Sequence, residues 1–121
     1  MTKESFTLDH ITLATTQTAA MVTFYNHVFD ANLVPVAAYG STLYKGSLAG
    51  IALLLCPNEI AGVQAEQNRH QLRFTVPDLE QVLARVRAAG GSVDADQSGD
   101  QTARAAVRDP DGNTIEFVQA V

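Results

Sequence analysis

Two residues near opposite ends of the chain have side chains that commonly bind metal ions. His10 lies in the segment Asp9–Ala14, and Glu116 lies in the segment Asp109–Phe117. Both are surrounded by apolar residues at the alternating spacing of a β-strand. An imidazole nitrogen and a carboxylate oxygen are ligands of divalent metals, and a carboxylate can also move a proton. His10 and Glu116 are therefore the first candidates for a functional site, with Glu116 as the candidate catalytic residue.

The elements that would position these two residues occur twice in the same order. A strand over residues 8–15 precedes a helix over Thr18–Asp30, and a strand over His70–Val76 precedes a helix over residues 78–89. Three short strands follow each helix: Leu33–Ala38, Thr42–Lys45 and Ile51–Cys56, then Ser92–Ala95, Ala103–Arg108 and Thr114–Val118. This order predicts an α+β fold of two βαβββ modules. We place them at about residues 6–57 and 70–121, joined by a linker at about 58–69.

Length and composition limit the class of protein. At 121 residues, 46% of them hydrophobic, the chain is expected to be one domain with a normal core. A formal net charge of -5 without a basic cluster argues against nucleic acid as a partner. The sequence has neither the long apolar run of a membrane span nor an apolar leader, and its one cysteine excludes an intrachain disulfide. We expect a cytoplasmic protein that binds a small molecule.

Strand alternation predicts which side chains point away from the helices and into a cavity. The predicted inward set is His10, Thr12, Ala14, Ala52, Leu54, Cys56, Gln71, Arg73, Thr75, Thr114, Glu116 and Val118. Tyr44 and Arg104 have the same predicted direction from their own strands. His70 would lie on the same side of the strand as Leu72, facing the helix, so it would enter the cavity only if a bulge turned it inward.

Several segments of the chain resemble the vicinal oxygen chelate superfamily, which includes glyoxalase I, bleomycin-resistance proteins, fosfomycin-resistance enzymes and extradiol dioxygenases. The segments are Asp9–Thr12, Phe24–Tyr25, Phe74–Leu79 and, most strongly, Arg108–Phe117. The resemblance covers nearly the whole chain and implies two βαβββ modules whose mixed sheets curl around a cavity. It also implies that the chain forms a homodimer, which would cover exposed sheet edges as well.

The resemblance further implies a place for a metal. The four positions that hold ligands in the superfamily correspond here to His10, Ala52, Gln71 and Glu116. Alanine cannot bind a metal, and glutamine binds one only weakly through its amide oxygen. If His70 replaced Gln71 through a bulge, two histidines and a carboxylate would suit iron or manganese.

Two functions follow from these residues. The first is a glyoxalase-like lyase, isomerase or oxygenase in which Mn, Fe, Ni or Zn chelates vicinal oxygens of a small substrate. The second is a metal-free protein of the bleomycin-resistance kind that sequesters a ligand. The predicted substrate-binding residues are Thr12, Tyr44, Leu54, Arg73 and Arg104. The inward parity of Arg73 and Arg104 suggests an anionic ligand, unless a carboxylate such as Glu116 is the partner of the arginines.

Overall fold

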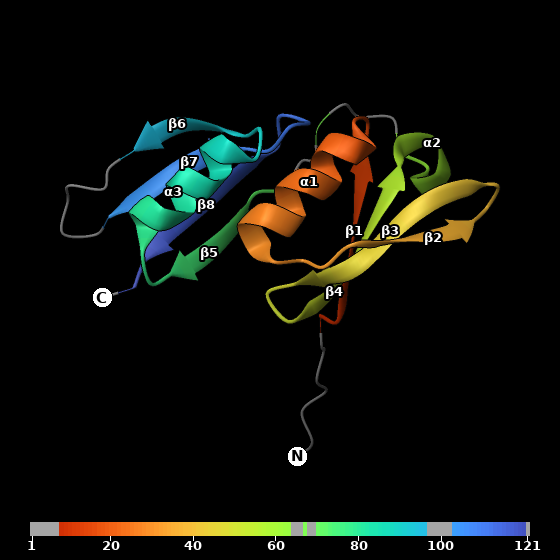
Figure 1. Cartoon of the computed structure of the whole chain (residues 1–121), viewed down its shortest axis with the longest axis horizontal. Helices are drawn as coiled ribbons and strands as arrows, with labels where there is room; N and C mark the ends of the chain where they lie inside the picture. The colour runs from red at the N-terminus through yellow and green to blue at the C-terminus, as the bar shows by residue number, and fades with distance from the viewer. Residues whose placement is uncertain (1–7, 64–66, 68–69, 97–102, 121) are drawn as a thin grey trace, which may run out of the picture.

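Two four-stranded sheets, each covered by a helix, make up the fold (Figure 1). The computed structural model describes residues 8–63, 67, 70–96 and 103–120. The first module contains β1 (His10–Thr15), α1 (Thr18–Phe29), β2 (Val34–Ala38), β3 (Ser41–Leu48), β4 (Ile51–Pro57) and the short helix α2 (Asn58–Ala61). The second contains β5 (Leu72–Val76), α3 (Leu79–Ala88), β6 (Ser92–Asp96), β7 (Arg104–Arg108) and β8 (Thr114–Gln119).

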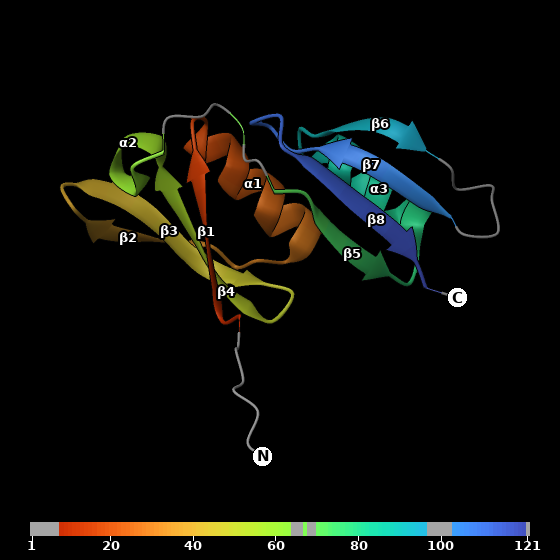
Figure 2. The ribbon, with the colours of Figure 1, turned by 180° about the vertical axis from the view of Figure 1, so that it is seen from behind.

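The strand order is the same in both modules. The first sheet has the order β1-β4-β3-β2 and the second has the order β5-β8-β7-β6. In each, the first and last strands of the module run parallel and the other pairs are antiparallel. The structure thus confirms the α+β fold of two βαβββ units with mixed sheets. Figure 2 shows that the two sheets lie side by side, with α1 and α3 behind them.

The two long helices start and stop where the sequence predicts. Asp78 caps α3, because its carboxylate accepts a hydrogen bond of 3.2 Å from the backbone N–H of Gln81. Asp30 ends α1 in the left-handed conformation. Each helix buries one face, with Met21, Phe24, Tyr25 and Val28 on α1 and Leu79, Val82, Leu83 and Val86 on α3. The predicted linker contains an unpredicted element, α2, which contacts β4 and β1.

One hydrophobic core joins the two modules. Phe29, at the end of α1, lies 4.8 Å from Phe74 of β5 and 5.8 Å from Phe117 of β8 between ring centroids. Helices α1 and α3 also contact each other. Helix α1 therefore packs on its own sheet and on the second module at once.

The turn before β4 sets the register of the first sheet. Ala49 and Gly50 both have positive φ, and this two-residue turn places Leu48 opposite Ile51. Counting back along β3, Tyr44 lies opposite Leu55, whose side chain is buried in the core. The predicted inward direction of Tyr44 is therefore wrong, since Tyr44 packs against the core.

Candidate functional site

Apart from Tyr44, the predicted inward residues of the strands occupy the sheet faces opposite α1 and α3. On β1, His10 and Thr12 are exposed, and a hydrogen bond of 2.8 Å joins His10 Nε2 to Thr12 Oγ1. The strand pairing puts Ala52 beside His10 and Leu54 beside Thr12. The first sheet therefore presents the imidazole of His10 next to the small apolar side chain of Ala52, which cannot serve as a second metal ligand.

The second sheet presents charged residues on the corresponding face. Arg73 lies opposite Glu116, and its Nε donates to Glu116 Oε1 over 2.6 Å. Arg104 lies opposite Val118, and Arg108 lies opposite Thr114, on the same face as Glu116. Arg108 Nε donates to Asp94 over 2.5 Å. Arg73 and Arg108 thus each have a carboxylate partner within the protein, which favours the protein-carboxylate explanation for Arg73.

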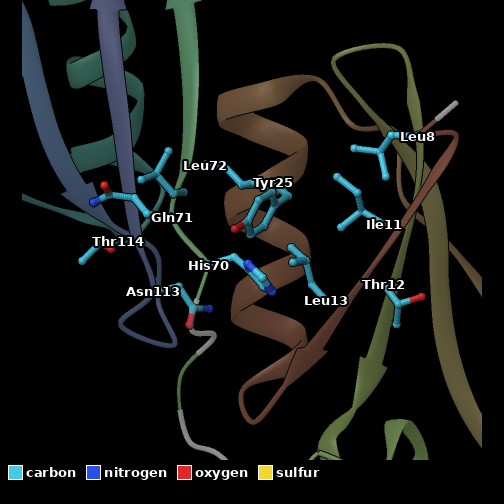
Figure 3. Close-up of a pocket in the computed structure, with 11 residues that line it drawn as sticks. Leu8, Ile11, Thr12, Leu13, Tyr25, His70, Gln71, Leu72, Asn113 and Thr114 are labelled. Atoms are coloured by element: carbon cyan, nitrogen blue, oxygen red, sulfur yellow. The ribbon is translucent and has the colours of Figure 1, made fainter. Parts of the chain in front are cut away.

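A groove of about 420 Å³ separates the two sheets (Figure 3). One wall comes from β1 and the segment before it, and the other comes from β5, β8 and the residues before them. Helix α1 lies behind, with Tyr25 pointing into the space. The lining residues are Leu8, Ile11, Thr12, Leu13, Tyr25, His70, Gln71, Leu72, Asn113, Thr114 and Ile115. This volume is that of a pocket for a drug-sized molecule.

The groove contains only part of the predicted site. Thr12, Gln71 and His70 line it, whereas His10, Glu116, Arg73, Arg104 and Leu54 do not. His70 precedes β5, whose pairing with β8 begins at Leu72, so His70 lies outside the strand pairing. His70 reaches the groove from outside the strand.

A buried polar network lies behind the groove. Asp109 is 3% exposed and accepts a hydrogen bond of 2.9 Å from the hydroxyl of Tyr25. The backbone and side-chain amides of Asn113 also donate to Asp109, over 2.9 and 3.0 Å. Burial raises the pKa of Asp109 above its ordinary value, while the bonds from Asn113 and Tyr25 lower it. Burial and then the charge of Asp109 raise the pKa of Tyr25 well above its ordinary value.

The family to which the chain belongs is decided by a family model that spans nearly all of it. The model of the Glyoxalase/Bleomycin resistance protein/Dioxygenase superfamily matches residues 7–117. The chain belongs to this superfamily.

Solved structures with the superfamily fold are similar over nearly the whole chain. FosX, a fosfomycin resistance protein from Mesorhizobium loti, is 18% identical with a TM-score of 0.76, and the match covers 98% of this chain and 94% of that one. TnmS3, an antibiotic binding protein from Streptomyces sp. CB03234, is 17% identical with a TM-score of 0.71, covering 99% and 100%. A glyoxalase-related enzyme from Fulvimarina pelagi is 24% identical with a TM-score of 0.68, covering 94% and 88%. These likenesses show the fold alone.

A comparison with curated proteins gives no significant match. Within the described part of the chain, no helix has the length and hydropathy needed to cross a membrane.

The residues at the metal position of the superfamily do not fit a resident transition metal. Glu116 shares its Oε1 with the guanidinium of Arg73, which would stand beside any bound cation and repel it. Ala52 supplies no donor beside His10. Within the described residues, no group of three or more His, Cys, Asp or Glu is placed to hold a metal ion. The predicted ligand set of His10, Gln71 and Glu116 contains only two residues of these types, so its role in binding a metal stays a prediction.

Alternation along single strands could not reveal the groove or the network behind it. The apolar walls of the groove include four helix-facing side chains that the sequence assigns to the core, those of Ile11, Leu13, Leu72 and Ile115. Asp109 and Asn113 carry the resemblance to the superfamily, but their contacts with Tyr25 depend on how the two modules pack. The motif itself, Asp109–Asn113, is the only sequence signal that points to them.

Proposed function

We propose that the chain is a small-molecule-binding protein that holds its ligand in the groove between the modules, without a resident transition metal. The observation that carries this proposal is the groove itself, with its drug-sized volume and a lining of apolar and uncharged polar side chains. The polar side chains of the lining include those of Thr12, His70, Gln71, Asn113 and Thr114. One protein with the same fold binds an antibiotic, as its name states, so a binding role is compatible with the fold.

The lining also indicates the chemical class of ligand. None of the eleven lining residues is Asp, Glu, Lys or Arg. A formal charge placed against these apolar walls would lose hydration without gaining a partner. The ligand expected in the groove is therefore an uncharged, largely apolar molecule with some hydrogen-bonding groups.

Saturable binding of Nile red, an uncharged flat dye, tests this proposal. We expect the wild-type protein to bind the dye at one site per groove and the Gln71→Trp variant to lose this binding, because the indole would fill the mouth. Gln81→Trp is the matched control, since Gln81 is an exposed glutamine on α3 outside the groove. The proposal fails if the wild type shows no saturable binding, or if both variants bind the dye equally.

A metal-dependent enzyme of the glyoxalase or dioxygenase kind is the second candidate. It is favoured by the retention of His10, Gln71 and Glu116 at three of the four superfamily ligand positions. In that case Mn, Fe, Ni or Zn would be held by these residues and would chelate vicinal oxygens of a substrate, with Glu116 moving a proton. Metal analysis of protein purified without chelator decides between the two candidates.

We further propose that the chain acts as a homodimer. Strands β1 and β5 each lie at the outer position of their sheet and flank the groove, and Leu8 beside β1 is 67% exposed. A second copy would cover these edges and close the groove into an enclosed cavity, to which both copies contribute. Light scattering at micromolar concentration tests the dimer, and a monomeric mass would contradict it.

A further inference from the structure

Several hydrogen bonds cross from the second module to the first beyond the end of β1. The carboxylate of Asp111, in the turn between β7 and β8, accepts bonds of 2.9 Å from the N–H and from the hydroxyl of Thr16. It also accepts a bond of 3.0 Å from the N–H of Gln17, whose side-chain amide donates to the carbonyl of Pro110 over 2.9 Å. We call these contacts, together with the bond from Tyr25 to Asp109, the clasp.

The clasp replaces a cap that α1 lacks. Gln17 occupies the N-cap position, but its side chain makes no capping hydrogen bond to the helix, and the first turn of α1 has no acidic residue. Asp111 supplies a negative charge at this positive end of the helix dipole from the other module. The helix and the turn of the second module therefore stabilise each other.

The position of the clasp in the chain connects it to both walls of the groove. Thr16 directly follows β1, which carries Ile11 and Leu13 on one wall. Asp111 stands three residues before Thr114, on the other wall. In Figures 1 and 2 the turn between β7 and β8 reaches over to the end of β1. The bonds of Asp111 therefore connect the segments that follow one wall and precede the other.

The buried part of the clasp connects it to the floor of the groove. Tyr25 and Asn113 both line the groove, and both donate to Asp109. Asp109 in turn accepts a bond of 3.0 Å from the N–H of Asp111. At the opposite end of α1, Phe29 packs on Phe74 and Phe117. Without Asp111, the start of α1 would lose its bonds to the turn, while the Tyr25–Asp109 bond and the contacts of Phe29 would remain.

We propose that Asp111 is a positioning residue for the groove: by clasping the end of β1 to the turn before β8, it fixes the groove width and so determines which ligands fit. This inference rests on the proposed binding function. Asp111 itself does not line the groove. Its effect on a ligand is therefore carried by the relative position of the two modules.

A distance measurement between the modules tests the clasp without any ligand. Spin labels are placed at Lys45→Cys on β3 and Arg87→Cys on α3, both exposed and outside the groove, in a Cys56→Ala background. We expect a narrow distance distribution for the parent and a broader one for Asp111→Ala. Asp111→Asn keeps an acceptor oxygen and should give an intermediate width. Glu80→Ala is the matched control, because Glu80 is an acidic residue in the first turn of its own helix, α3.

Nile red titration of the same variants tests the consequence for binding. We expect the dye Kd of Asp111→Ala to rise about tenfold, the loss expected for about 1.4 kcal/mol, with Asp111→Asn in between and Glu80→Ala unchanged. An unchanged distance distribution in Asp111→Ala overturns the inference, and so does a broader distribution with an unchanged Kd. If Asp111→Ala does not fold, Asp111→Asn and Thr16→Ala give the same two readouts. If the wild type does not bind the dye, the proposed function fails, and the distance distribution still decides whether Asp111 sets the separation of the modules.

Discussion

Arg73 and Glu116 lie opposite each other on parallel strands, and 2.6 Å separates Arg73 Nε from Glu116 Oε1. The carboxylate that corresponds to a metal ligand in the superfamily is thus bound to a cation of the protein itself. A divalent metal at this carboxylate would have to compete with the guanidinium and remain next to its charge. This relationship supports the proposal of a binding protein without a resident metal.

The first prediction concerns metal binding. We expect protein purified without chelator to contain no stoichiometric Mn, Fe, Ni or Zn, and these ions to stabilise the wild type no more than they stabilise His10→Ala. Arg73→Ala should bind Mn²⁺ more tightly than the wild type does, because Glu116 is then released. Elemental analysis and thermal unfolding with each ion are the measurements. Arg87→Ala, an exposed arginine on α3, is the control.

The opposite result would support the second candidate function, a metal-dependent enzyme. One metal ion per chain in the wild type, lost in His10→Ala, would assign His10 and Glu116 to a metal site built within one chain or across the dimer. Metal that is retained in His10→Ala would instead contradict the ligand role of His10.

Alternation of side chains was sufficient to predict the face of the second sheet. Arg73, Arg104 and Glu116 were expected to point away from α3, and the register pairs Arg73 with Glu116 and Arg104 with Val118 on that face. The pattern was clear because Leu72, Phe74, Ile115 and Phe117 are large and apolar, so only one face of each strand can be buried.

The same reasoning failed for Tyr44 because β3 has no such contrast. Leu43 is 3% exposed and Tyr44 packs against the core, so both pack, and the turn at Ala49 and Gly50 sets which of them faces the core. Counting through a two-residue turn from Leu55 would have placed Tyr44 in the core. The clasp could not be predicted at all, because its residues are more than 80 positions apart in the chain, as the separations of 95 for Thr16 to Asp111 and 84 for Tyr25 to Asp109 show.

The second prediction concerns the buried hydroxyl of Tyr25. Tyr25→Phe leaves Asp109 with one donor fewer, and we expect a loss of about 1–3 kcal/mol in the free energy of unfolding at neutral pH. Urea unfolding measures this loss. Tyr39→Phe is the control, since Tyr39 is 81% exposed. An equal stability of Tyr25→Phe and the wild type would show that the bond to Asp109 contributes nothing net.

The third prediction is the pH dependence that follows from the same residue. The pKa of Tyr25 is raised well above its ordinary 10.0, first by burial and then by Asp109. Above pH 10 the unfolded chain releases this proton while the folded chain keeps it, so the unfolded state binds fewer protons and stability falls as pH rises. We expect a shallower fall in Tyr25→Phe. Cys56, whose pKa burial also raises, contributes with the same sign and is present in both proteins.

The measurement is urea unfolding over a series of alkaline pH values. An identical slope for the wild type and Tyr25→Phe would contradict the assignment of this proton to Tyr25.

The fourth prediction concerns the close approach of β3 to the end of α1. A Cβ on Gly46 would collide with the backbone carbonyl of Ala31, which also accepts a hydrogen bond from Ser47. Backbone cannot move aside as a flexible side chain can, so Gly46→Ala should lower the melting temperature strongly. Gly40→Ala is the matched control, because a Cβ there meets no atom within 4 Å and only its positive φ of 68° is unfavourable. We expect about 1–2 kcal/mol for that strain, and a smaller loss in Gly46→Ala than in Gly40→Ala would contradict the register of β3.

The last prediction distinguishes an uncharged ligand from an anionic one. The groove lining contains no Asp, Glu, Lys or Arg, and Arg73, on the open sheet face, forms an ion pair with Glu116. Aromatic amides should therefore displace Nile red at lower concentration than the carboxylates of the same ring, because the carboxylate must lose hydration on entering the groove. Competition titrations with such amide and carboxylate pairs measure the difference. If the carboxylates compete better, and Arg73→Ala or Arg104→Ala removes that advantage, the ligand is anionic and binds on the face of the second sheet, as the parity of the two arginines in the sequence suggests.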